Sequence, residues 1–213
     1  MGAKLMGRWA SGAPIMRAEN ADIPEIARDN CADNNFNFVR GSSLIQAGAG
    51  QCVDNLFPRS QGDELGLICP HAAHIRKANP RDDLAQQGPG ANSNMHRIIR
   101  RGIPFGKPYP EDGERGLLFF CYQTSIERQF EHILRNWLNN PNFLNVDSGY
   151  DPISGQNNYD SNRTRTFTLP VRNMDQSISK VTLKLEEEWI TVTGGAYFFA
   201  PSISALGYLA NDE

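Results

Sequence analysis

The sequence predicts a single α+β domain built around an antiparallel sheet. Residues 116–122 are apolar on both faces, which is typical of a strand in the middle of a sheet. An amphipathic helix follows at once, and further strand-like stretches come only towards the end of the chain. Because strands and helices do not alternate regularly, parallel βαβ units are not expected and an antiparallel arrangement is favoured.

Length and composition are those of an ordinary globular domain. The 213 residues (23.7 kDa) can bury one core. A net charge of −3 and a pI near 5.8 give no sign of a nucleic-acid-binding surface, and no apolar run reaches the ~20 residues of a membrane span. The four cysteines are widely spaced and no hydrophobic secretory segment follows the start, so a reduced, cytoplasmic setting is expected.

The first 65 residues are predicted to be mostly irregular. Turn-forming residues at 7–14 indicate a loop pinned by Trp9. Residues 19–37 are rich in Asn and Asp, but they lack the regular ligand spacing of a calcium loop, so a polar surface loop is favoured. Residues 41–65 show little periodicity and are interpreted as a long connection, of the kind that often carries function.

Residues 66–81 combine imidazoles, small residues and arginines. Two alanines precede His74 and would let a flat ligand approach its ring, while Arg76 and Arg81 offer positive charge for anionic groups. A lone histidine is more often a satisfied polar residue than a ligand. Cys69, His71 and His74 can also be interpreted as zinc ligands, although the expected fourth ligand is missing.

The middle of the chain is predicted to enter the core. Residues 82–94 are polar and glycine-rich and indicate a surface excursion. Ile98 and Ile99, which arginines flank, predict a short strand that ends at Gly102 and Pro104. Because neighbouring side chains of a strand face opposite ways, one of Arg100 and Arg101 is expected to turn inward.

After the strand at 116–122, a helix is predicted from a capping box at Thr124 to Leu138, ending at Asn139. Asp151 then lies in a turn-rich loop, where an Asp-Pro turn and an orienting carboxylate are both open interpretations. Residues 181–185 alternate as a strand does, and residues 189–199 predict a pair of strands joined at two glycines.

Six stretches of the chain resemble the haem domain of dye-decolourising peroxidases. Three follow one another in the family's order, and three more are similar: CPHAAHIRKANPR at 69–81, IIRRGIPFG at 98–106, RGLLFFCYQ at 115–123, GRWASGAP at 7–14, DPISGQ at 151–156 and GGAYFFAPS at 194–202. The resemblance covers most of the chain. It implies a ferredoxin-like antiparallel sheet with helices on one side, one half of a dimeric α+β barrel, and a single C-terminal haem-binding domain over residues 1–213.

The resemblance also implies roles for individual residues. His74 would be the axial ligand of the iron of haem b, Asp151 the carboxylate on its other nitrogen, and Arg81 a partner of a haem propionate. Arg100 would stand over the distal face. Leu117 and Phe119 would line the distal pocket. Trp137 matches a position that relays electrons from dyes in some relatives, although its helical spacing favours plain packing.

One motif of the family has no counterpart. Members carry Gly-x-x-Asp-Gly in an N-terminal half, where the aspartate moves the peroxide proton; here Tyr109 stands where the glycine before Asp112-Gly113 would be. Loss of a positioned acid–base group lowers a rate by about two to four orders of magnitude. The chain is therefore expected to be the second half of the fold, with exposed apolar surface that favours a partner chain or homo-oligomer.

Three functions follow from the resemblance. The first is a peroxidase domain that uses hydrogen peroxide to oxidise bulky organic reductants such as dyes. The second is a haem-binding half that is feeble alone and needs an N-terminal partner chain to supply the aspartate. The third is a non-enzymatic interaction domain.

Overall fold

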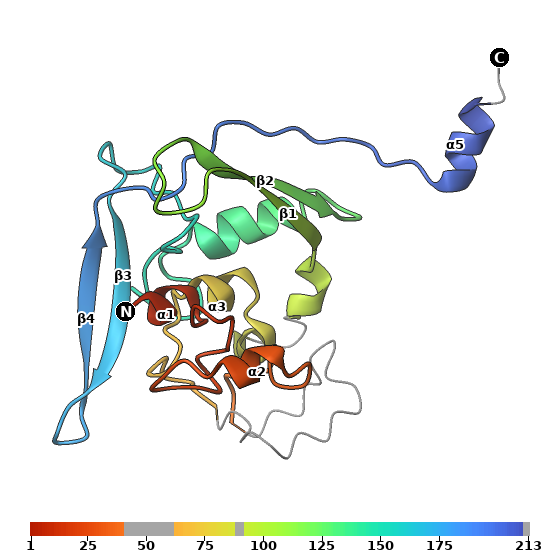
Figure 1. Ribbon diagram of the computed structural model, residues 1–213. Coiled ribbons are helices and arrows are strands. Elements are labelled where there is room, and N and C mark those ends of the chain that lie inside the picture. Colours follow the sequence, from red (N-terminus) through yellow and green to blue (C-terminus); the bar gives the residue numbers. More distant parts are fainter. Residues whose placement is uncertain (41–61, 88–91, 211–213) are drawn as a thin grey trace.

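The computed structural model describes residues 1–40, 62–87 and 92–210 of the chain. Short helices and two pairs of antiparallel strands alternate irregularly along it (Figure 1), which confirms the α+β class. The elements are α1 Gly2–Met6, α2 Pro24–Arg28, α3 His74–Ala78, the 3-10 helices η1 Arg81–Gln87 and η2 Ser93–His96, β1 Ile99–Gly106, β2 Arg115–Tyr122, α4 Phe130–His132 continuing as the π-helix η3 Ile133–Leu138, β3 Arg165–Arg172, β4 Ile178–Leu185, and α5 Ile203–Ala210.

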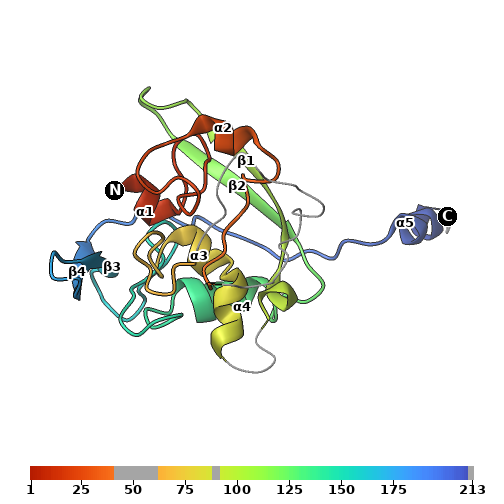
Figure 2. The ribbon, with the colours of Figure 1, turned by 90° about the horizontal axis from the view of Figure 1, so that it is seen from below.

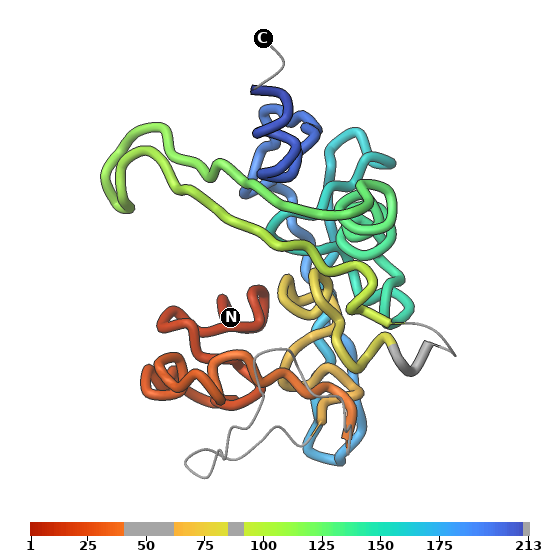
Figure 3. Tube along the Cα trace, turned by 90° about the vertical axis from the view of Figure 1, so that its right-hand side faces the viewer, coloured from red at the N-terminus to blue at the C-terminus, as the bar shows by residue number. Residues whose placement is uncertain are grey.

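The described strands pair as two separate antiparallel hairpins. In the first, β1 pairs with β2 from Ile99 opposite Tyr122 to Gly106 opposite Arg115. In the second, β3 pairs with β4, and an isolated bridge joins Phe167 of β3 to Gly149. The β1–β2 hairpin projects from the body on the side of the N-terminal segment (Figure 3).

The β1–β2 hairpin corrects two expectations. Strand β2 was expected to be central, yet among the described strands it pairs with β1 alone, and most of its side chains are exposed. Strand β1 is longer than expected because it continues through Gly102 and Pro104, which an edge strand tolerates since proline lacks an N–H to donate. Neither Arg100 nor Arg101 turns inward, because both faces of β1 are exposed.

Two further expectations about local structure are wrong. Residues 189–199 form no strand pair, because no described strand lies beside them. They run in an extended conformation past α4, where the Tyr197 hydroxyl bonds to Glu131 at 3.1 Å, and the chain then leads to α5, which lies away from the body (Figures 1 and 2). The helix expected from Thr124 begins at Phe130, since the side chain of Gln129 accepts the N–H groups of Thr124 and Ser125. It ends before Asn139, as predicted.

The N-terminal half differs from the expectation in several places. Residues 19–37 are not a plain polar surface loop, because they contain α2 and bury Ile26, Ala32 and Phe36 in the core. The loop at 7–14 is pinned by Trp9, whose Nε1 donates to the carbonyl of Ala18 at 2.6 Å. The polar stretch 82–94 contains η1 and η2 rather than plain loop, and most of the stretch 41–65 lies outside the described residues. Reduced cysteines were expected, because disulfides are rare in reducing compartments. Cys31 is instead disulfide-bonded.

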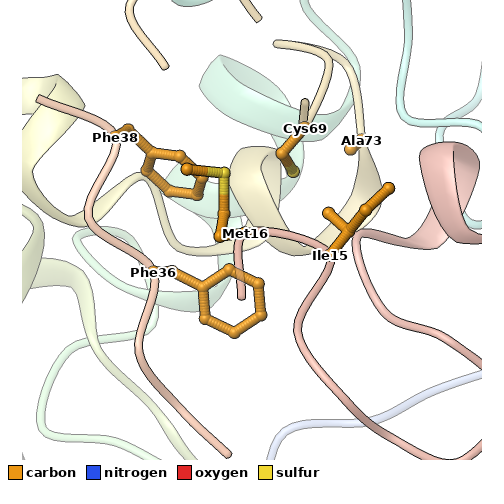
Figure 4. Packing of buried hydrophobic residues seen from close by; sticks show 6 residues of the cluster. All are labelled: Ile15, Met16, Phe36, Phe38, Cys69 and Ala73. Atoms are coloured by element: carbon orange, nitrogen blue, oxygen red, sulfur yellow. The ribbon is translucent and has the colours of Figure 1, made fainter. Parts of the chain in front are cut away.

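The core that holds α3 comes from three segments of the chain. Ile15, Met16, Phe36 and Phe38 pack from the N-terminal segment onto Cys69 and Ala73 (Figure 4). A second cluster places Leu84 against the helix α4–η3 and Phe143, so α3 lies between the two clusters. Within the described residues, no helix has both the length and the apolar character that crossing a membrane requires.

Candidate functional site

His74, at the start of α3, forms a hydrogen-bonded pair with the buried Asp151. The His74 Nδ1 donates a hydrogen bond to Oδ2 of Asp151 at 2.7 Å. The Asp151 carboxylate is fully buried, whereas the imidazole remains 31% exposed. Its Nε2 has no hydrogen-bond partner among the described residues. With Nδ1 carrying the proton, the lone pair of Nε2 is free to bind a metal or another acceptor.

The loop after Asp151 holds the carboxylate in place. Its Oδ1 accepts the backbone N–H groups of Ile153 at 3.0 Å, Ser154 at 2.6 Å and Gly155 at 3.2 Å. A Cβ at Gly155 would overlap the backbone of Asp151, so only glycine fits this tight turn. The buried Arg165 fastens the loop from β3 by donating to the carbonyls of Pro152 at 2.9 Å and Gly155 at 3.2 Å.

The charges of the pair favour an ionised carboxylate beside a basic imidazole. Burial lowers the pKa of His74, but the charge and hydrogen bond of Asp151 outweigh it, and the pKa is raised. Burial raises the pKa of Asp151, but the His74 contact and the loop N–H groups outweigh it, and the pKa is lowered. Asp151 therefore orients the ring and makes it a stronger donor of its lone pair.

Helix α3 is anchored by the contacts of its own Arg76 and by the packing of the N-terminal segment. The fully buried Arg76 donates to Asp83 at 2.5 Å and to Asp63 at 3.2 Å, and it also bonds the carbonyl of Cys69 at 2.5 Å. On the other side, Gly7 has a φ of +90°, and a Cβ there would overlap Ile75. The glycine of the GRW motif thus lets the N-terminal segment press against the helix that carries the imidazole.

The guanidinium groups of two arginines lie over the same aromatic ring near α3. The guanidinium carbon of Arg81 lies 4.4 Å from the centroid of the Phe36 ring, and that of Arg8 lies 4.9 Å from it. Neither forms an ion pair with a carboxylate in the described part of the chain; they bond to the side chain of Asn34 and to backbone carbonyls. Burial and then the charge of Arg8 lower the pKa of Arg81 to about 9. The two neighbouring guanidinium groups therefore favour the binding of an anion.

Arg100 lies on β1 within electrostatic reach of the pair. Its charge lowers the pKa of His74 and that of Arg8, although burial is the largest effect on both. On β2, Leu117 is 58% exposed and Phe119 is 43% exposed. They alternate on one face of the hairpin, opposite Pro104 and Gly102.

The zinc interpretation of this segment finds no support. Cys69 is fully buried in the core, and burial raises the pKa of its thiol to about 12, so the thiolate that zinc needs is disfavoured. His71 is occupied by the carbonyl of Glu64, 3.1 Å from its Nε2. No group of three metal-ligating side chains gathers anywhere in the described ranges.

Comparison with known proteins places this arrangement in a family. Residues 55–148 match the family model of the C-terminal domain of Dyp-type peroxidases. The chain is 36% identical to Peroxidase 2 of Mycetinis scorodonius and 33% identical to the dye-decolorizing peroxidase AauDyP1 of Auricularia auricula-judae, each over 97% of this chain but only 39% and 38% of the relative. An ancestral D-type dye decolorizing peroxidase matches with a TM-score of 0.73 and 39% identity, over 97% of this chain and 42% of that structure.

The chain belongs to the dye-decolourising peroxidase family. It spans about two-fifths of the length of the relatives it matches. The antiparallel α+β fold expected from the resemblance is the fold of these relatives.

Dye-decolourising peroxidases imply a haem cofactor, and the residues present fit it. His74 offers an unpartnered Nε2 on an oriented, half-exposed ring, which suits an axial iron ligand. Arg81 and Arg8 offer two guanidinium groups that no carboxylate of the described ranges pairs with, and such groups suit propionates.

Trp137 is buried in this member of the family. Its side chain is 3% exposed and stacks on Phe143, with the rings 5.4 Å apart and 12° from parallel. The stacked imidazoles of His96 and His132 meet its edge at 5.2 and 5.4 Å. The packing interpretation therefore has a physical basis, and the electron-relay role remains a prediction.

Three residues of the site were not predicted from the sequence. They are Arg8, Arg165 and Lys77; Arg8 and Lys77 lie inside quoted motifs but received no role there, and Arg165 lies outside every motif. The GRW motif at the start of the chain was the available signal for Arg8. Arg165 and Lys77 bond to backbone carbonyls, and such contacts leave no mark on residue spacing.

Proposed function

We infer that this chain binds haem b with His74 as the axial ligand of the iron and serves a peroxidase that reduces hydrogen peroxide and oxidises bulky organic compounds such as dyes. The observation that carries this proposal is the hydrogen bond between His74 and the buried Asp151, while Nε2 has no partner in the described part of the chain. When bound, haem supplies the redox-active iron that takes electrons from the reductant and passes them to peroxide.

The chain's own residues would share the remaining work. Asp151 holds the Nδ1 proton of His74 and fixes the ring. Arg81 and Arg8 would grip the propionates by charge-assisted hydrogen bonds. Arg100 would offer its fixed positive charge to the anionic oxygen released as the peroxide O–O bond breaks. Leu117 and Phe119 would form an apolar wall beside it.

A haemin titration tests the proposal. The full chain is expected to develop a Soret band that saturates at one equivalent, and His74→Ala is expected to abolish it. His132→Ala is the matched control, because His132 is half-buried and lies in another cluster, with His96 and Trp137. A band of equal strength in His74→Ala would end the proposal.

A second candidate is a haem-binding half that turns over slowly until a partner chain covers it. Its support is the exposure of Leu117 and Phe119 on a hairpin with two uncovered faces, together with the absence of Gly-x-x-Asp-Gly from the sequence. Without the aspartate, proton movement is expected to be about two to four orders of magnitude slower. Peroxide turnover measured with and without a separately produced N-terminal half decides between the two, since equal rates would reject the partner.

A further inference from the structure

Lys77 is a buried cation one turn after His74. Its side chain is fully buried, and its Nζ donates to the carbonyls of Trp137 at 3.1 Å and Asn140 at 2.5 Å. No ion pair joins it to a carboxylate in the part of the chain that the structure describes. The other buried cation of α3, Arg76, has Asp63 and Asp83 as partners.

The carbonyls that Lys77 contacts belong to the end of the π-helix η3 and the turn after it. The last turn of a helix leaves carbonyls without partners and carries partial negative charge, so an ammonium group is stabilised there. Burial lowers the pKa of Lys77 to about 7, and Asp151 opposes that shift. Such a desolvated ammonium group persists only where its acceptors are well placed.

The same helix end also holds Asp151. The backbone N–H of Asp151 donates to the carbonyl of Leu138 at 3.0 Å, next to the carbonyl of Trp137. The N–H of Gln156, five residues later, donates to Oδ1 of Asn139 at 2.8 Å. The α3 helix and the Asp151 loop are therefore both fastened to the residues 137–140.

We propose that Lys77 is a positioning residue for the His74–Asp151 pair: its ammonium group ties α3 to the helix end that also holds Asp151, and so sets the 2.7 Å contact between imidazole and carboxylate. The contact exists in the chain without any cofactor. Its consequence for haem rests on the proposed function.

Proton NMR of the full chain without haem tests the tie directly. The Nδ1 proton of His74, held against a carboxylate, is expected to resonate well downfield of the amide protons, and its loss in Asp151→Asn assigns it. In Lys77→Met, which keeps the length but removes the donor, that resonance is expected to move upfield or vanish. An unchanged resonance in a folded Lys77→Met protein overturns the proposal.

Lys4→Met is the matched control, because Lys4 also donates to a backbone carbonyl, that of Leu67 at 2.5 Å, but lies on α1. If Lys77 contributed only to stability, Lys77→Met would lower the unfolding midpoint, as Lys4→Met would, and the His74 resonance would stay unchanged. If Lys77→Met does not fold, Lys77→Gln supplies the same reading, since its amide can reach only one of the two carbonyls. A wild-type resonance in Lys77→Gln would overturn the proposal as well.

Haem affinity is the second measurement. Loss of residues that orient a metal ligand weakens affinity by about 10–100-fold, so Lys77→Met is expected to bind haemin at least tenfold more weakly than Lys4→Met. Equal affinity together with an unchanged proton resonance rejects the positioning role. A chain that shows the resonance but binds no haem rejects the proposed function and leaves the role of Lys77 intact.

Discussion

The Nδ1 of His74 lies 2.7 Å from Oδ2 of Asp151, although 77 residues separate them in the sequence. The two side chains come from different elements, the first turn of α3 and the loop after η3, and they meet with the carboxylate fully buried. A carboxylate placed on the far nitrogen of an imidazole raises the electron density of the near one.

Asp151→Asn is expected to weaken haem binding by about 10–100-fold, because the amide keeps the shape of the side chain but loses the charge that orients and polarises His74. Haemin titrations of the two proteins check this. Asp112→Asn, an exposed position in the β1–β2 turn, is expected to bind as the unaltered chain does. Equal affinity in Asp151→Asn would show that the pair does not serve an iron ligand.

Arg8→Ala and Arg81→Ala are each expected to lower haem affinity by about 10–100-fold, the effect of losing one charge-assisted hydrogen bond to a propionate. Both guanidinium groups lie on the Phe36 ring, and neither has a carboxylate partner among the described residues. Arg172→Ala, at the exposed end of β3, is the control. The comparison also separates the two residues, since an effect in Arg81→Ala alone would exclude Arg8 from the anion site.

Gly7→Ala is expected to destabilise the chain by about 1–3 kcal/mol, because the added methyl group would overlap Ile75 at a φ of +90°. Gly2→Ala is matched to it: both glycines belong to α1 or its end, but nothing lies within 4 Å of a Cβ at Gly2. Urea unfolding of the two variants measures the difference between their free energies of unfolding. Equal midpoints would mean that the N-terminal segment does not press on α3.

His71 is expected to make the chain less stable as the pH falls below about 6.5. Burial lowers its pKa to about 3, so between these values the unfolded chain binds a proton that the folded chain does not. The unfolding free energy should rise with pH by about 1.4 kcal/mol per unit in that window. Urea unfolding between pH ~4.5 and ~6 measures the slope, where most carboxylates are already ionised.

His71→Gln removes the titrating group and is expected to reduce that slope, whereas His96→Gln, at a half-buried position on η2, is expected to keep it. A His71→Gln protein with the same slope as the unaltered chain would contradict the prediction.

The β1–β2 hairpin is expected to make the chain self-associate. Leu118 and Phe120 are about half exposed on one face, opposite the face that carries Leu117 and Phe119. Leu118→Lys combined with Phe120→Lys should shift sedimentation towards the monomer without changing haem affinity. Met174→Lys, in the β3–β4 turn, is the control, and an equal effect of both changes would exclude the hairpin as the contact.

Sequence motifs pointed to the candidate residues of the site, but they did not predict the contacts that hold these residues in place. The CPHAAH segment and the DPISGQ loop pointed to His74 and Asp151, and the structure places these two side chains 2.7 Å apart. Lys77 could not be predicted, because its acceptors are backbone carbonyls 60 and 63 residues away. Backbone carbonyls are present at every residue, so no sequence pattern marks those that a buried lysine will need.

The sequence predicted the positions of β1, β2 and β4 but missed β3, and it was less successful in predicting which strands pair. The apolar run at 116–122 does form β2, and the alternating run at 181–185 lies in β4. The run at 189–199 has a similar strand propensity, but no described strand lies beside it, and it forms no ladder. Strand propensity reports how a segment fits a sheet, and it does not provide the adjacent strand whose hydrogen bonds complete it.

Helix α3 has only five residues, too few to hold together in water without outside help. Its order comes from contacts with Asp63, Asp83 and the end of η3, which lie on both sides of it in the sequence. During synthesis, the imidazole would leave the ribosome long before residues 137–140 emerge to receive Lys77. A porphyrin meeting the nascent chain would find no fixed axial position, so cofactor capture should wait until the second half of the chain is complete.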